Sequence, residues 1–301
     1  MNTIIENTGV EIDLFGNIVE KNPLLRDKFI EPPFSVLDTK QGSWQRRKNM
    51  WKNIGIKSEV GRDSIAIVSG TDNYRKINEK DGYENRNDYV SIFDPALCEV
   101  LYHWFCPKDG EILDPFAGGS VRGVVANYLG YKYTGIDIRK EQIDNNIEQA
   151  SDILNINNQP NWYVGDSNKI LNGFNKEFDF IFSCPPYADL EVYSELDGEL
   201  SNMDYDEFLI SYKSIIKKSC SLLKKGGYAC FVVGEVRDKN GNYYGFVPDT
   251  IRLFQEVGMD FYNEAILLNA IASASMRANG NMKSQKLVKV HQNILIFKKG
   301  V

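Results

Sequence analysis

The residues best suited to chemistry stand together at Ser183-Cys184-Pro185-Pro186-Tyr187, directly after the apolar run Phe178–Phe182. The two prolines restrict the backbone, so a loop carbonyl can be held in one direction. The tyrosine ring offers a flat surface for stacking, and Ser183 and Cys184 add a hydroxyl and a thiol. The pattern predicts a catalytic loop that orients a polar group beside an aromatic ring. The alternative interpretation is a rigid turn without chemistry.

Three acids follow three successive apolar segments and predict a nucleotide-like cofactor. Asp114 opens the turn Asp114-Pro115-Phe116-Ala117-Gly118-Gly119-Ser120, whose glycines allow a ligand to approach the backbone. Asp137 lies 23 residues further on, near the ~20-residue spacing at which an acid meets ribose hydroxyls. Asp166 could bond an adenine amino group. The alternative is a structural strand–helix turn, and the absence of G-x-G-x-x-G disfavours a nicotinamide cofactor.

Alternating strands and helices must position these residues. Helices are expected at Pro95–Phe105, with Asp94 as N-cap, and then at 121–129, 140–150, 208–223 and 251–257. Strands are expected at 111–114, 131–136, 162–164, 178–182, 228–233, 261–268 and 291–297. This order predicts a doubly wound α/β fold with a mostly parallel, seven-stranded sheet. The last two strands, with no helical pattern between them, are expected to form an antiparallel hairpin at the sheet edge.

The first 88 residues are less regular. Residues 70–89 are polar and rich in turn formers, which predicts an extension over residues 1–88 and a catalytic domain over residues 89–301. The extension contains Trp44, Arg46, Arg47, Lys48 and Trp51, a mixture of aromatic and basic side chains that suits a nucleic-acid contact. The alternative, which we favour, is a helix that packs its tryptophans on the core.

Charge is unevenly distributed in the second half of the chain. Residues 189–207 contain eight acids and no Lys or Arg, which predicts either a solvated loop or a lid over the cofactor. From Ala265 onward there is no acid. The connection between the last two expected strands, residues 269–290, carries Arg277, Lys283 and Lys286, which could follow a nucleic-acid backbone. An ordinary surface loop is the alternative.

Composition narrows the class of protein. The chain has 301 residues, of which 43% are hydrophobic and 25% charged, as in ordinary globular proteins. No apolar stretch approaches the ~20 residues of a membrane helix, and the first residues do not resemble a signal peptide, so we expect a cytoplasmic protein. Five cysteines without zinc-type spacing and two histidines predict no metal site. The net charge of −6 argues against extended phosphate contact, although local charge can override it.

The chain resembles the DNA amino-methyltransferases, which make N6-methyladenine or N4-methylcytosine. Their cofactor motif is similar to Asp114-Pro115-Phe116-Ala117-Gly118, and their catalytic motif is an Asp, Asn or Ser followed by Pro-Pro-Tyr. Residues 93–97 and 291–298 resemble the segment before the cofactor motif and the last strand, and residues 32–56 resemble phage and prophage DNA methylases. The resemblance covers about residues 90–300. It implies a Rossmann-like fold, S-adenosylmethionine as cofactor, and double-stranded DNA with an extruded base as substrate. A phage or restriction–modification setting is implied with it.

The resemblance gives the loop a chemical role. An exocyclic amine is a poor nucleophile, and acceptors that bond both of its N–H groups place partial negative charge where positive charge develops. The tyrosine would stack on the extruded base. Two departures stand out: Cys184 occupies the acceptor position, and Gly119-Ser120 replaces the Ser-Gly of many relatives. A thiol is a weak acceptor, so Ser183, a loop carbonyl or an outside group would do the bonding.

Three alternatives stay open at this point. Cys184 could act as a nucleophile, as in enzymes that methylate a pyrimidine carbon, although those place Pro before Cys. The substrate could be RNA, a protein amide or a small molecule, which the acidic net charge suits. The chain could also be a non-catalytic binding protein that kept the fold.

Overall fold

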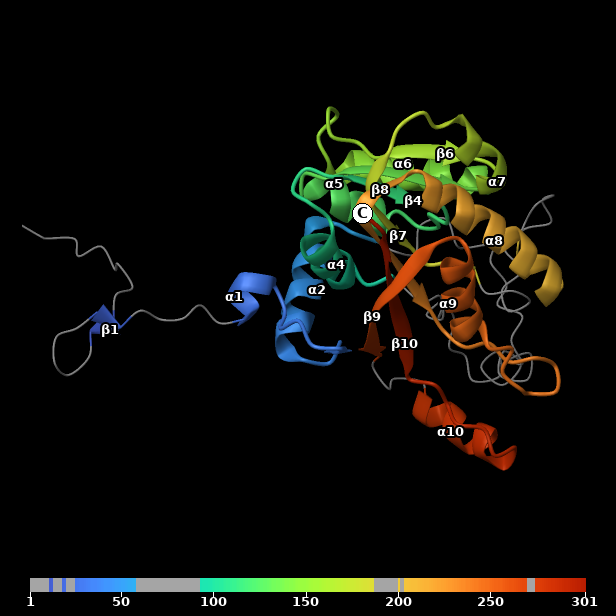
Figure 1. The fold of residues 1–301 in the computed structure, drawn as a ribbon. Coiled ribbons are helices and arrows are strands. Elements are labelled where there is room, and N and C mark those ends of the chain that lie inside the picture. The colour runs from blue at the N-terminus through green and yellow to red at the C-terminus, as the bar shows by residue number, and fades with distance from the viewer. Residues whose placement is uncertain are drawn as a thin grey trace, which may run out of the picture. The chain divides into compact units, whose positions relative to one another are not determined.

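The computed structural model describes residues 11–12, 18–19, 25–57, 93–186, 200, 203–269 and 274–301 (Figure 1). The chain divides into two compact units, residues 1–33 and 34–301. In the first unit, β1 (Glu11–Ile12) pairs antiparallel with β2 (Ile18–Val19), and α1 (Leu25–Phe29) follows. The Nε atom of Arg26 lies 3.2 Å from a Glu31 carboxylate oxygen. The second unit contains all the residues expected to do chemistry.

The second unit is built on one sheet of eight strands in the order β3-β9-β10-β8-β7-β4-β5-β6. The five strands from β4 to β8 are all parallel to one another. In contrast, β10 is antiparallel to both of its neighbours, β8 and β9. The expected α/β fold with a mostly parallel sheet and an antiparallel C-terminal hairpin is therefore confirmed. The strands are β3 (Val36–Asp38), β4 (Glu111–Asp114), β5 (Lys132–Asp137), β6 (Asn161–Val164), β7 (Phe178–Ser183), β8 (Leu223–Val233), β9 (Met259–Leu268) and β10 (His291–Lys299).

The eighth strand corrects the expected count of seven. β3 pairs parallel with β9, and the Thr39 hydroxyl donates a hydrogen bond of 2.7 Å to the Leu268 carbonyl just beyond it. Of its three residues only Leu37 is buried. A strand this short has no alternating pattern that the sequence could reveal.

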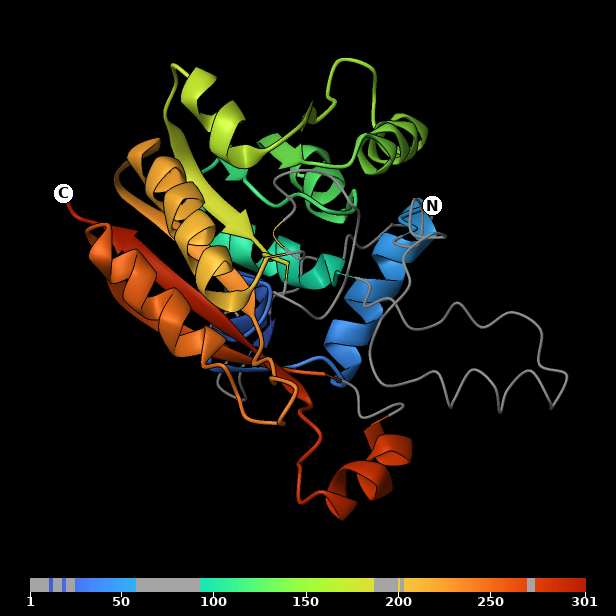
Figure 2. The same ribbon diagram turned by 90° about the vertical axis from the view of Figure 1, so that its right-hand side faces the viewer.

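Helices cover both faces of the sheet, as Figures 1 and 2 show. One group consists of α2 (Gly42–Ile54), α4 (Pro95–Phe105), α5 (Val121–Tyr128) and α6 (Lys140–Ile153). On the other face lie α7 (Ser167–Ile170), a 3₁₀ turn (Leu171–Gly173), α8 (Tyr205–Ser221) and α9 (Phe246–Glu256). The central strands are therefore apolar on both sides, and Phe178, Phe180, Phe182 and Phe231 are fully buried.

The helix α4 begins as the sequence predicts and anchors α2. Asp94 accepts a hydrogen bond of 2.9 Å from the Ala96 amide, and Pro95 occupies the first turn. The indole nitrogens of Trp44 and Trp51 donate to Asp94 and Glu99, at 3.2 and 2.9 Å. Residues 34–57 thus pack in the same unit as the sheet. The expected boundary at residues 88 and 89 lies outside the described residues and stays a prediction.

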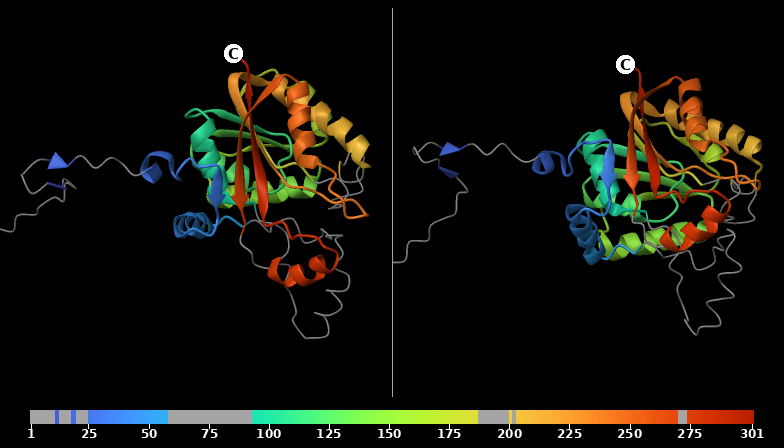
Figure 3. Two further views of the ribbon diagram at one scale, coloured as in Figure 1. Left: turned by 60° about the horizontal axis from the view of Figure 1, so that its bottom comes forward. Right: turned by 90° about the horizontal axis from the view of Figure 1, so that it is seen from below.

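The connection between β9 and β10 contains a helix that was not expected, α10 (Ala274–Lys283). It projects beyond the edge of the sheet (Figures 2 and 3). Ala274 is the one buried side chain among those described in this helix. Since the helix has no apolar stripe, its sequence lacks the 3.6-residue periodicity that identifies helices packed on a core.

Candidate active site at the carboxyl edge of the sheet

The expected site residues meet at one edge of the sheet. Asp114 ends β4, Asp137 ends β5, and Ser183 ends β7. β4 lies between β5 and β7 and is parallel to both, so their carboxyl ends face the same edge. Ligands of such folds bind at this edge.

The Asp114 carboxylate organises the centre of the site. It is completely buried, and each oxygen accepts two hydrogen bonds. Oδ1 accepts from the Ser183 hydroxyl at 2.5 Å and the Phe116 amide at 3.1 Å. Oδ2 accepts from Arg122 Nε and from the Tyr133 hydroxyl, both at 2.6 Å. The acceptor positions of Asp114 are therefore filled. The carboxylate shapes the predicted cofactor turn (residues 114–120, called the cofactor turn below) and fixes the start of the predicted catalytic loop at Ser183.

Arg122 is a central residue that the sequence analysis did not single out. Its guanidinium donates to the carbonyls of Phe116 and Ala117, at 2.6 and 2.8 Å, and lies 4.5 Å from the ring centroid of Phe93. Burial lowers the pKa of Arg122, but the nearby Asp114 carboxylate outweighs this and raises it overall. The available signal was a lone arginine, eight residues after Asp114, in the otherwise uncharged first turns of α5.

Gly118 and Asp137 connect the cofactor turn to β5. Gly118 has φ = +51°, a conformation that favours glycine. Its amide donates to Asp137 Oδ2 at 2.9 Å, and the Arg139 amide donates to Oδ1 at 2.9 Å. Burial raises the pKa of Asp137. Each oxygen keeps one acceptor position, which suits the two hydroxyls of a ribose.

The remaining cofactor candidates lie around this turn. Asp166 caps α7 and accepts from the Asn168 amide at 2.8 Å through Oδ1, which leaves Oδ2 for an amino group. Phe116 is partly buried, with ring centroids 5.8 Å from Tyr212 and 6.5 Å from Phe231. Gly119 is partly exposed. The donors and acceptors present therefore fit a cofactor that carries ribose and adenine, and the individual roles of these residues stay predictions.

The catalytic loop is described as far as Pro186. Ser183 and Pro185 are buried, whereas Cys184 and Pro186 are partly exposed. Because the Ser183 hydroxyl donates to Asp114, it is already committed and is a poor candidate for bonding a substrate amine. None of the five cysteines forms a disulfide. Tyr187 and residues 189–199 of the acidic stretch lie outside the described residues.

The expected substrate-binding residues differ in their exposure, and some of them are buried or paired with acids. Trp44 is 2% exposed, so its assignment as a substrate contact is corrected: the tryptophan packs in the core, as the favoured alternative held. The guanidinium of Arg47 lies 2.6 Å from a Glu99 oxygen, whereas Arg46 is exposed. Arg277 and Lys283 are exposed on α10, and Lys286 is partly exposed just beyond it.

Across the described parts of the chain, no three His, Cys, Asp or Glu side chains gather as a metal would require. Among the helices that the structure describes, none combines the length and apolar character needed to cross a membrane.

A protein-family model matches the part of the chain that contains the cofactor turn and Asp137. Residues 21–149 match the N6_N4_Mtase family, whose members are described as DNA methylases. The match supports the resemblance seen in the motifs, and with it the methyltransferase class and the cofactor S-adenosylmethionine. The match includes the cofactor turn and Asp137 and ends before the catalytic loop. A search of curated proteins gave no match.

Several solved structures are similar in fold. TrmN from Thermus thermophilus is 14% identical with a TM-score of 0.46; the match covers 69% of this chain and 49% of that one, so this chain spans about half of TrmN. Magnesium protoporphyrin IX methyltransferase from Synechocystis PCC 6803, with bound S-adenosylmethionine, is 12% identical with a TM-score of 0.45 over 78% and 93% of the chains. TehB from Haemophilus influenzae is 15% identical with a TM-score of 0.44 over 70% and 64%. Likenesses at this level carry no information about the substrate.

Proposed function

We propose that this chain transfers a methyl group from S-adenosylmethionine to an exocyclic amino group of DNA, N6 of adenine or N4 of cytosine. The observation that carries the proposal is the 2.5 Å hydrogen bond from the Ser183 hydroxyl to Asp114. It joins the cofactor turn, which lies within the family match, to the catalytic loop, which lies outside it. A methyl donor and an amine acceptor must be adjacent for direct transfer.

The cofactor would be held by the turn around Gly118, by Asp137 and by Asp166. When bound, it supplies a methyl group on a positively charged sulfur. The buried network around Asp114 keeps the turn and the catalytic loop in fixed positions, so neither has to reorganise during the reaction.

The catalytic loop would bind the substrate amine. Since the Ser183 hydroxyl is committed to Asp114, the amine would be bonded by backbone carbonyls of the loop, with the Cys184 sulfur as a weaker acceptor. A carbonyl held by Pro185 and Pro186 is the stronger acceptor. The cofactor would supply the methyl group to the amine nitrogen, and these acceptors would orient the N–H groups and pass the one proton that the amine loses to water. Tyr187 would stack on the extruded base.

The substrate surface would include α10 and the segment after it. Arg277 and Lys283 are exposed there and Lys286 is partly exposed, in a stretch without acids, which favours phosphate despite the net charge of −6. Double-stranded DNA with the target base extruded is the substrate that this arrangement suits. A phage or restriction–modification setting remains an expectation from the sequence.

The direct test is incubation of the protein with methyl-labelled cofactor and unmodified DNA, followed by nucleoside analysis. We expect label in N6-methyladenine or N4-methylcytosine, and an Asp137→Asn variant should need more cofactor for the same rate. Label in RNA or protein but not in DNA would favour the other substrates. Cofactor binding without methylated bases would favour a binding protein and refute the proposal.

A further inference from the structure

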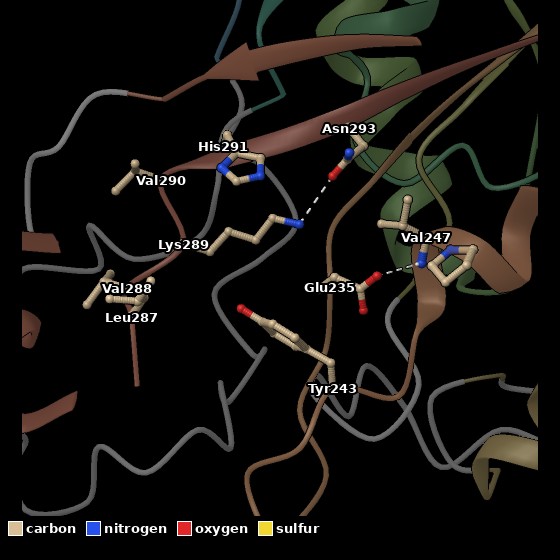
Figure 4. Close-up of a pocket in the computed structure, with 10 residues that line it drawn as sticks. Glu235, Tyr243, Val247, Leu287, Val288, Lys289, Val290, His291 and Asn293 are labelled. Atoms are coloured by element: carbon tan, nitrogen blue, oxygen red, sulfur yellow. Dashed lines mark hydrogen bonds between the residues drawn. The ribbon is translucent and has the colours of Figure 1, made fainter. Parts of the chain in front are cut away.

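A cavity of about 420 Å³ lies at the carboxyl edge of the sheet, beyond the end of β8 (Figure 4). This volume falls in the range of ligand pockets, roughly 300–1,000 Å³. Its walls come from the segment after β8, the start of α9 and the segment that leads into β10. It is lined by Glu235, Tyr243, Val247, Pro248, Leu287, Val288, Lys289, Val290, His291 and Asn293.

The cavity lies on the side of β7 that is away from the turn after β4. β7, which carries the loop, stands between β4 and β8. The cofactor turn follows β4, and the cavity lies past β8 and at the start of β10, on the opposite side of β7. Neighbouring strands are about 4.8 Å apart, so the cavity begins one to two strand spacings, about 5–10 Å, from the loop. A substrate whose amine reaches the loop would therefore have the cavity within reach of its neighbouring groups.

Both hydrogen-bond acceptors and hydrogen-bond donors line this cavity. The two carboxylate oxygens of Glu235 accept from the amides of Phe246 and Val247, at 3.2 and 3.1 Å, and each keeps an acceptor position. Lys289 Nζ donates to Asn293 at 3.2 Å and has two further protons to donate. Burial lowers the pKa of Lys289. Figure 4 shows the Lys289 ammonium directed towards Asn293 and the Glu235 carboxylate directed towards the backbone of Val247.

Tyr243 supplies an aromatic surface. The guanidinium of Arg237 lies 3.9 Å from its ring centroid, and Arg237 is held in turn by a 2.6 Å hydrogen bond to the Gly241 carbonyl. Arg237 and Tyr243 also form a β-bridge. Tyr243 is nevertheless 47% exposed. One face of the ring is therefore fixed from behind, while the other can stack on a flat ligand.

We propose that this cavity binds the nucleobase next to the methylated base, extruded from the duplex together with it, with its ring on Tyr243 and its edge bonded by Glu235 and Lys289. A base combines a flat apolar face with a rim of donors and acceptors, which matches this lining. The inference rests on the proposed function and adds to it: the enzyme reads the identity of one flanking base through this cavity.

The test uses the full-length protein and DNA with randomised bases around the target, with methylated positions identified by sequencing. Tyr243→Ala should raise KM for DNA by about tenfold, since stacking on one base is worth that order. It should also flatten the preference at one adjacent position. Lys289→Met should flatten the same position. Tyr243→Phe keeps the ring and should stay within about twofold of the wild type.

Tyr262→Ala is the matched control. Tyr262 is 50% exposed and has the Lys298 ammonium 5.2 Å from its ring centroid, but it lies on β9 near the opposite edge of the sheet. It should leave KM and the flanking preference unchanged. The Kd for cofactor, measured by calorimetry, should be the same in all variants and shows that each is folded.

The outcomes separate the two proposals. If the wild type methylates DNA and Tyr243→Ala keeps its KM and flanking preference, the cavity has another role and this inference is wrong. If the wild type methylates no DNA, the proposed function fails, and the inference fails with it.

Discussion

Replacing Arg122 by methionine tests whether the buried network holds the site together. Arg122 and Asp114 are 5% and 0% exposed, and their charged atoms are 2.6 Å apart. Methionine keeps much of the apolar volume but leaves the Asp114 charge without its counter-ion. Breaking a buried pair in this way costs about 3–5 kcal/mol. We expect Arg122→Met to lower the free energy of unfolding by about 4 kcal/mol.

The assay is urea denaturation followed by tryptophan fluorescence. With a slope near 3 kcal/mol per M, the expected loss shifts the midpoint by about 1.3 M. Lys140→Met is the control: Lys140 lies 2.5 Å from Asp144, but the two side chains are 73% and 57% exposed. Such surface pairs contribute at most about 0.5 kcal/mol.

A second substitution isolates the charge effect. Adding Asp114→Asn to Arg122→Met removes the uncompensated charge, so the double variant should be less destabilised than the sum of the two single variants. A loss below about 1 kcal/mol for Arg122→Met would refute the reasoning. Strict additivity of the two substitutions would also contradict it, because partners in one network must be coupled.

Three further results are expected. Burial raises the pKa of Asp137, and only the ionised carboxylate accepts from both ribose hydroxyls. Cofactor affinity, measured by calorimetry, should therefore fall on acidification, and at a higher pH than an ordinary carboxyl group would give. Asp137→Asn should abolish this pH dependence. Gly123→Ala should cost about 1–3 kcal/mol in urea denaturation, because the new Cβ would lie 2.5 Å from Trp162, whereas Gly280→Ala, with nothing within 4 Å, should not destabilise. Cys184→Asp supplies a stronger acceptor and should raise kcat about tenfold, or 1.4 kcal/mol, with unchanged cofactor affinity; a lower kcat would show that the thiol itself is needed.

The sequence predicted those parts of the fold that depend on local patterns. Pro95–Phe105 and Glu111–Asp114 are predicted with their observed bounds. The first has a capping acid and a proline at its start, and the second is an apolar run that ends in an acid. β8 begins at Leu223 rather than at Tyr228, because the strand continues through Gly226 and Gly227 instead of starting after them.

The interior of the site could not be predicted in the same way. Asp114 meets Tyr133, Arg122 and Ser183 only after three other elements have packed around it. Trp44 likewise finds its acceptor, Asp94, fifty residues away. Such partners depend on the arrangement of the elements and leave no periodic signal in the chain.

The position of β10 between β8 and β9 has a consequence for synthesis of the protein. β3 is made early, but its partner β9 begins 221 residues after β3 ends. At about 5–20 residues per second on the ribosome, roughly 10–45 s pass between the synthesis of β3 and that of β9. β9 in turn joins the sheet only through β10, so β8 presents an open edge until residues 291–299 emerge. Open edges invite pairing between chains, so we expect the nascent chain to be most prone to aggregation before β10 is inserted.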